Sequence, residues 1–109
     1  MSDGKGKTMK EKKDNVLEAG RKEIEEIDRA MARLFHRRME ISRAIGRYKR
    51  DQGLPVRDRH REEALLANNE KEVPEEDREA YRLFFQEVLA LSRTCQEEIQ
   101  EGTWTEKKA

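Results

Sequence analysis

The sequence has little of the material that builds an ordinary globular core. Of its 109 residues, 34% are hydrophobic and 6% aromatic, whereas 44% are charged, against a typical charged share of about 25%. A domain of this size buries roughly 60–70% of its unfolded surface, so its stability is marginal even with a normal core. We therefore expect a second copy of the chain to complete part of the core.

Other scarcities narrow the class of protein. A single cysteine cannot form a disulfide within the chain, which fits a reducing compartment. No apolar run approaches the roughly 18 residues of a membrane span, and none resembles a signal peptide. Basic and acidic residues balance at 24 each, without the basic excess of a nucleic-acid binder. We expect a cytoplasmic protein that binds neither membranes nor nucleic acid.

Two prolines and six glycines leave room for long helices. Residues 1–15 and 102–109 are polar and lack periodic apolar residues. Such segments cannot offset the entropy of ordering, so we expect a disordered N-terminal tail and a short C-terminal tail. Trp104 is an exception, since it can pack back onto a helix. One domain is predicted between the tails, over residues 16–101.

A long first helix is predicted from about Val16 to Asp51. Apolar residues recur there in two series with heptad spacing, and together they define a seam along one face. The series are Leu17, Ile24, Met31, position 38 and Ile45, and Ile27, Leu34, Ile41 and Tyr48. A helix of this length spans ~50 Å. It cannot fold against itself, so it needs partners along its whole length.

Two breaks divide the rest of the chain into a short and a long helix. The first helix ends at Gly53-Leu54-Pro55, and Asp58 is the predicted N-cap of a helix over about 59–70. Pro74 suits the first turn of a third helix that ends near Gln100. The apolar residues expected to face inward are Ala64, Leu65, Leu66, Tyr81, Phe84, Phe85, Val88, Leu89, Leu91, Cys95 and Ile99. No strand-like alternation is present, so the predicted fold is all-α, with a long, a short and a long helix.

Polar residues interrupt the apolar face of the first helix. Arg38 occupies a seam position whose heptad mates are Met31 and Ile45. A guanidinium there costs several kcal/mol unless a partner compensates it. Its structural alternative is snorkelling, or pairing with a core carboxylate. Lys49 follows three helical turns later, close to the same face, and taken alone it is a solvated lysine.

The other two helices have matching interruptions. Ser92 and Gln96, at i and i+4, break the apolar stripe of the third helix, and Arg61-Glu62 begins the short helix. Arg21 flanks the seam of the first helix. Each of these alone is explained as a surface or edge residue. Together, fixed cations, a carboxylate and neutral polar groups suit a small, dry site for an organic dianion that carries a hydroxyl.

The sequence contains no evident nucleophile, metal site or phosphate loop. His36 and His60 stand alone, and Cys95 is expected to be a small core residue. No Gly-rich phosphate-binding motif is present. We therefore expect catalysis by positioning and electrostatics, without a cofactor or a metal.

An ordered set of motifs resembles the all-helical (type II) chorismate mutase family. The set is R-x-x-I-x-x-I-D from Arg21, the basic pair Arg37-Arg38, I-G-x-x-K from Ile45, G-L-P-V-x-D-x-x-R-E from Gly53, and Ser92-x-x-x-Gln96. The resemblance covers about residues 17–100. It implies an intertwined helical homodimer that converts chorismate to prephenate in aromatic amino-acid biosynthesis.

The same resemblance assigns roles to individual residues. Arg38 and Arg21 would grip the substrate carboxylates, Lys49 and Gln96 would hydrogen-bond the ether oxygen, and Glu62 would hold the ring hydroxyl. The implied substrate-binding set is Arg21, Arg38, Lys49, Asp58, Arg61, Glu62, Ser92 and Gln96. Within it, the catalytic residues are Lys49, Gln96, Arg38 and Glu62. Arg21 would come from the neighbouring chain, because 28 residues separate it from Lys49, or ~42 Å of continuous helix.

Two alternatives stay open. One is an isochorismate-pyruvate lyase of the same fold, against which Glu62 argues, because that relative lacks the carboxylate at the matching place. The other is a non-catalytic helical dimerisation module. The seam alone allows such a module, but a module gives no reason for Arg38, Lys49, Ser92 and Gln96 to interrupt apolar faces together.

Overall fold

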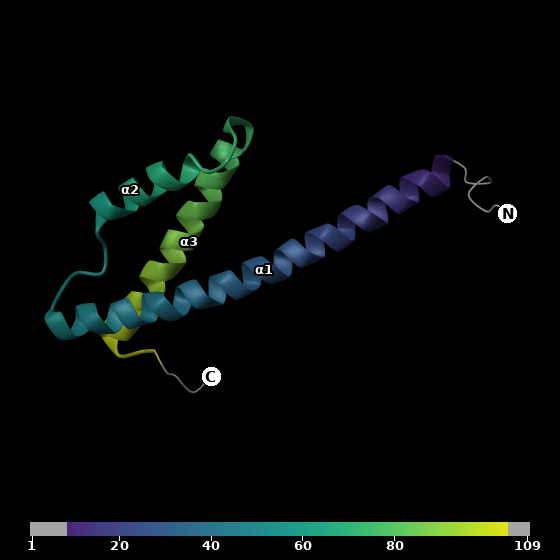
Figure 1. Cartoon of the computed structure of the whole chain (residues 1–109). Helices are drawn as coiled ribbons and strands as arrows, with labels where there is room; N and C mark the ends of the chain where they lie inside the picture. Colours follow the sequence, from purple (N-terminus) through teal and green to yellow (C-terminus); the bar gives the residue numbers. More distant parts are fainter. Residues whose placement is uncertain (1–8, 105–109) are drawn as a thin grey trace. The chain divides into compact units, whose positions relative to one another are not determined.

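The computed structural model describes residues 9–104, which form three α-helices. They are α1 (Met9–Gln52), α2 (Arg59–Glu70) and α3 (Glu75–Glu101), in the long, short, long order that the sequence predicts (Figure 1). The all-α prediction is confirmed. The remainder of the two expected tails, residues 1–8 and 105–109, lies outside the described residues. In the described part of the chain, no helix combines the length and apolarity needed to cross a membrane.

The chain divides into two compact units, with the boundary inside α1 after Arg37. In the N-terminal unit, α1 begins at Met9 rather than at Val16, so residues 9–15 are helical and not part of a disordered tail. These residues contain neither proline nor glycine. Extending an existing helix requires no new nucleus, and lysine and glutamate are good helix formers.

No residue from Met9 to Arg37 is buried. The large apolar side chains of this segment are all exposed, namely Met9, Val16, Leu17, Ile24, Ile27, Met31, Leu34 and Phe35. The predicted seam therefore exists as a helix face, but the described residues of one chain do not bury it.

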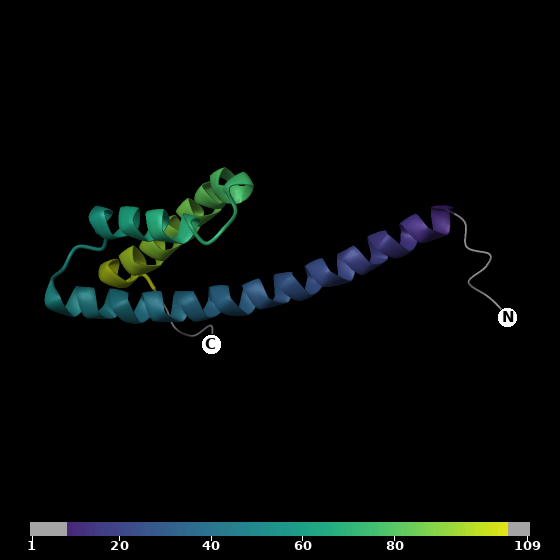
Figure 2. The same cartoon turned by 45° about the horizontal axis from the view of Figure 1, so that its top comes forward.

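The C-terminal unit contains the core, which lies mainly between α2 and α3. These helices lie side by side (Figures 1 and 2). The central cluster consists of Leu66, Phe85, Val88 and Leu89, with Leu65 and Tyr81 packed against it. Three residues expected to face inward, Ala64, Phe84 and Leu91, are exposed instead. Phe84 and Leu91 each precede a buried residue, so they point about 100° away from the buried face.

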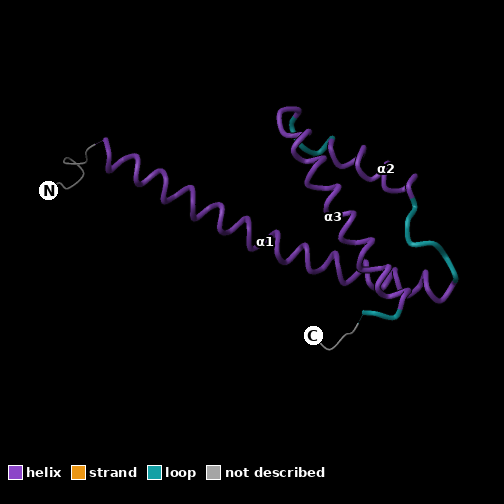
Figure 3. Tube along the Cα trace, turned by 180° about the vertical axis from the view of Figure 1, so that it is seen from behind, coloured by secondary structure: helices purple, strands orange, loops and turns teal. Residues whose placement is uncertain are grey.

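Short connections set the geometry of this unit (Figure 3). The N-cap prediction for Asp58 is confirmed, since its side chain accepts a hydrogen bond from the Arg61 backbone N–H at 3.0 Å. Pro74 occupies the N-cap of α3 rather than its first turn. Gly102 ends α3 with φ of 77°, a left-handed conformation that favours glycine. Beyond it, Trp104 packs back on α1, where the Arg43 guanidinium lies 4.8 Å from the centroid of the Trp104 ring.

The last turns of α1 pack closely on α3 at Gly46. A Cβ atom built on this glycine would lie 3.0–3.2 Å from side-chain and backbone atoms of Gln96. Real Cβ atoms rarely approach neighbours so closely, so the glycine allows the two helix backbones to come together. This approach places the polar residues that follow in one cavity.

Candidate active site

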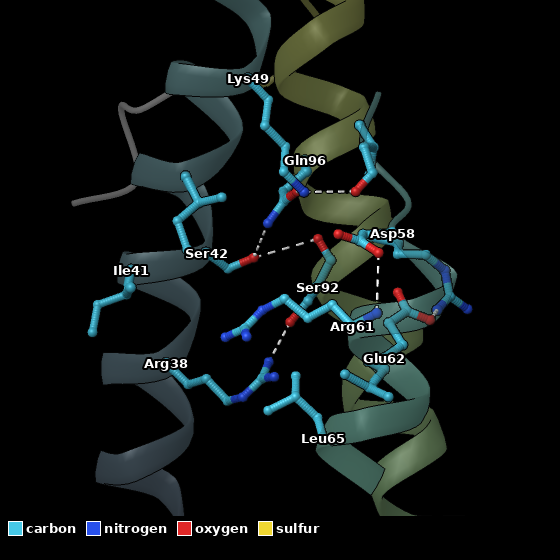
Figure 4. A pocket seen from close by; sticks show the side chains of 14 residues that line it. Arg38, Ile41, Ser42, Lys49, Asp58, Arg61, Glu62, Leu65, Ser92 and Gln96 are labelled. Carbon is cyan, nitrogen blue, oxygen red and sulfur yellow. Dashed lines mark hydrogen bonds and ion pairs between the residues drawn. The ribbon is translucent and has the colours of Figure 1, made fainter. Parts of the chain in front are cut away.

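A cavity of about 330 Å³ opens among the last part of α1, the start of α2 and the second half of α3. All of its lining residues belong to the C-terminal unit. Among them is every predicted site residue except Arg21, namely Arg38, Lys49, Asp58, Arg61, Glu62, Ser92 and Gln96 (Figure 4). Arg21 belongs to the N-terminal unit, on the exposed surface of α1.

Arg38 projects from α1 toward α3. Its Nη1 donates a hydrogen bond to Ser92 Oγ at 2.5 Å, and its guanidinium lies over the Phe85 ring, 5.6 Å from the centroid. Both contacts are neutral groups rather than the core carboxylate of the structural alternative. They orient the guanidinium without cancelling its charge, so it is prepared to bind an anion.

Lys49 lies nearer the end of α1 and faces the same cavity (Figure 4). Its Nζ donates to the Val56 carbonyl at 2.7 Å and to Gln96 Oε1 at 3.2 Å. These bonds use two of the three N–H donors of the ammonium group. The third N–H can donate to a ligand, and the two existing hydrogen bonds fix the position of the ammonium charge.

Gln96 is oriented from both ends of its amide, and its exposed fraction is only 7%. Oε1 accepts from Lys49, and Nε2 donates to Ser42 Oγ at 3.0 Å. The Ser42 hydroxyl in turn lies 3.5 Å from the Ser92 carbonyl, to which it donates. One amide N–H of Gln96 is then left over for a ligand.

The sequence interpretation missed Ser42. It is among the most buried residues of the chain, with 5% exposed. Its signal was available, because it stands four residues after Arg38 and four before Gly46, on one helix face. A small polar residue in that register fits a close helix contact and can orient a buried amide.

Glu62 is held by two arginines. Arg93 Nη1 on α3 donates to its Oε1 at 2.6 Å, and Arg57 Nε lies 3.6 Å from the same oxygen. The sequence interpretation missed Arg93 as well, although it follows Leu89 by one helical turn and so faces α2. Asp58 and Arg61 complete this side, and the Arg61 side chain extends across the cavity toward α1 (Figure 4).

The charges of the lining are unequal. Four cations, Arg38, Lys49, Arg61 and Arg93, stand against the two carboxylates Asp58 and Glu62. The formal charge of the lining is therefore +2, in a chain whose net charge is zero. Apolar side chains of all three helices form the rest of the wall, among them Ile41, Leu65 and Leu89. Such a cavity suits a small organic dianion.

The chain belongs to the chorismate mutase type II family, whose model matches residues 20–97. The match includes all eight predicted site residues, from Arg21 to Gln96. The comparisons with curated proteins and with solved structures gave no match. Membership of the family defines the class of protein, and seven of the eight predicted site residues line the cavity.

Proposed function

We propose that the protein is a chorismate mutase, which rearranges chorismate to prephenate within one molecule. The observation that carries the proposal is the joining of Arg38, Lys49, Glu62 and Gln96, from all three helices, in one cavity of positive formal charge. Chorismate is a dianion with a ring hydroxyl and an ether oxygen. The lining offers cations for the carboxylates, an acceptor for the hydroxyl and donors for the ether oxygen.

The reaction breaks the C–O bond of the ether while a C–C bond forms, and it needs no proton transfer or covalent intermediate. The residues must therefore hold the flexible dianion folded, with the two carbons in contact, which is worth several kcal/mol. The ether oxygen gains negative charge in the transition state. Lys49 Nζ, fixed by Val56 and Gln96, stabilises that charge more than it stabilises the ground state.

The proposal includes a homodimer in which each cavity receives Arg21 from the neighbouring chain. The exposed seam of α1 supports this, since side chains such as Ile24 and Ile27 are each 57% exposed in one chain. Heptad seams of this kind bury their apolar residues against a second helix. Arg21 and Lys49 are separated by ~42 Å of helix rise, so no small dianion reaches both within one chain.

The direct test is to add purified protein to chorismate, follow the loss of its ultraviolet absorbance and identify the product. Prephenate supports the proposal. Release of pyruvate from isochorismate, without conversion of chorismate, supports the lyase alternative. No reaction with either substrate leaves a dimerisation module, and the mutase proposal is then wrong.

The shared site has a separate test. Arg21→Ala chains and Lys49→Ala chains are unfolded, mixed and refolded together. In each mixed dimer one cavity regains both residues, and random pairing makes about half of the dimers mixed. Activity should recover to about a quarter of wild type, while either variant alone stays nearly inactive. A mixture that contains mixed dimers but is no more active than the average of the two variants contradicts the contribution of Arg21 across chains.

A further inference from the structure

Two adjacent residues of α3 hold opposite charges from different helices. Ser92 Oγ accepts from Arg38 of α1, and Arg93 donates to Glu62 of α2 at 2.6 Å. The first contact orients the group assigned to a substrate carboxylate. The second orients the group assigned to the ring hydroxyl. The spacing between these two binding groups is therefore set by a single turn of α3.

The contact between Arg93 and Glu62 is well placed to fix a rotamer. Both side chains are mostly covered, with 23% and 17% of their surface exposed. The bond is charge-assisted and short, so it is stronger than a neutral hydrogen bond. Arg57, at 3.6 Å and 46% exposed, contributes less. Both arginines approach Oε1, so Oε2 is the oxygen left for a ligand.

Without Arg93, the Glu62 side chain would be held mainly by the longer and more exposed contact with Arg57. A free glutamate samples several rotamers, and each bound substrate would have to select one of them at an entropic cost. Positioning errors of about 1 Å in a binding group can lower rates by as much as ~100-fold. The effect of Arg93 on the reaction would then be transmitted entirely by Glu62.

We propose that Arg93 is a positioning residue, which holds Oε1 of Glu62 so that Oε2 is presented to the substrate hydroxyl. The inference rests on the proposed mutase function. It does not require Arg93 to contact the substrate.

A double-mutant cycle tests this, with kcat and KM measured for wild type, Arg93→Met, Glu62→Gln and the double variant. Arg93→Met should lower kcat/KM roughly 10- to 100-fold when Glu62 is present, because the carboxylate loses its orientation. In the Glu62→Gln background the same change should cost less than about twofold, because there is no carboxylate left to position. Arg93→Lys should restore part of the activity, since it keeps a charged donor without the planar fork.

Arg82→Met is the matched control. Arg82 also joins α3 to α2, through a 2.5 Å ion pair with Glu70, but neither residue lines the cavity. Its loss should leave kcat/KM within about twofold of wild type, because exposed ion pairs contribute little. A loss as large as that of Arg93→Met would mean that any bridge between these helices matters, and the positioning role would be wrong.

The remaining outcomes separate the two proposals. If wild type converts chorismate but the two changes are additive, Arg93 acts independently of Glu62 and the inference is overturned alone. If wild type does not convert chorismate, the proposed function fails and the inference fails with it. Should Arg93→Met not fold, as thermal unfolding would reveal, the cycle is repeated with Arg93→Lys, and additivity there overturns the inference.

Discussion

The two units of the chain share the exposed heptad seam of α1, but among the described residues only the C-terminal unit contains buried ones. From Met9 to Arg37 the seam residues are exposed and none is buried, whereas every buried residue of the described chain lies at or beyond Ser42. The pattern therefore indicates which face of a helix is apolar, but not what covers it. In the C-terminal unit α3 covers Ser42 and Gly46 of α1, whereas the seam residues are still about half exposed, namely Ile41, Ile45 and Tyr48. In the N-terminal unit the described residues supply no cover, and the proposed homodimer would supply it from the second chain, since long helices depend on packing.

The largest expected effect is on chemistry in the C-terminal unit. Lys49→Ala should lower kcat by ~10²–10³, the usual cost of removing a donor aimed at developing charge. The fold should persist, because the change removes two hydrogen bonds worth about 1 kcal/mol each. Activity assays with chorismate measure kcat, and thermal unfolding of the same sample measures the stability of the fold.

Arg50→Ala is the matched control for Lys49→Ala. Arg50 is the next cation along α1, but it is exposed, pairs with Asp51 and does not line the cavity. Its kcat should stay within about twofold of wild type, as expected for an exposed ion pair. Equal losses in the two variants would assign the effect to the end of α1 in general rather than to the Lys49 ammonium.

The second largest effect is expected in the N-terminal unit. Ile27→Glu changes a side chain that is 57% exposed in one chain, and at an ordinary exposed position it would cost under about 0.5 kcal/mol. If a second chain buries the seam, the free energy of unfolding should instead fall by about 3 kcal/mol or more, with dissociation. Sedimentation and thermal unfolding at several protein concentrations distinguish the two results.

Arg29→Glu is the control for the charge change, because it lies two residues beyond Ile27 and outside both apolar series. It should remain associated and as stable as wild type to within about 0.5 kcal/mol. Dissociation of Arg29→Glu, or full association of Ile27→Glu, would contradict the proposed use of the seam as the dimer interface.

The same division explains how much could be predicted from the sequence. Local signals were sufficient for the three helices, the Asp58 cap and the break at Gly53, because each depends on neighbours along the chain. The start of α1 was predicted too late, since polar composition was taken as disorder although these residues favour helix. Seven of the eight predicted site residues line the cavity, and Arg21 does not. The hydrogen-bond partners of these residues were not predicted, because Ser42 bonds to residues of α3 and Arg93 to a residue of α2, both far away in the sequence.

The smallest expected effect is a difference in stability between two substitutions within α1. Each unit contains one glycine of this helix, Gly20 in the N-terminal unit and Gly46 in the C-terminal unit. Replacing either glycine by alanine adds the same helix propensity, about 1 kcal/mol in favour of the folded state. At Gly20 a new Cβ meets no atom within 4 Å, whereas at Gly46 it lies 3.0–3.2 Å from Gln96. Gly20→Ala should therefore raise the free energy of unfolding by about 0.5–1 kcal/mol.

Gly46→Ala should be less stable than Gly20→Ala by about 1–3 kcal/mol, because the methyl group overpacks the contact between α1 and α3. It should also lower kcat, since it displaces the amide that orients Lys49. Denaturant unfolding at one protein concentration measures the difference between the two variants. Equal stabilisation by both would mean that α1 can move away from α3 without cost. Equal destabilisation would mean that Gly20 is itself packed against another helix, and the prediction for Gly20→Ala would be wrong.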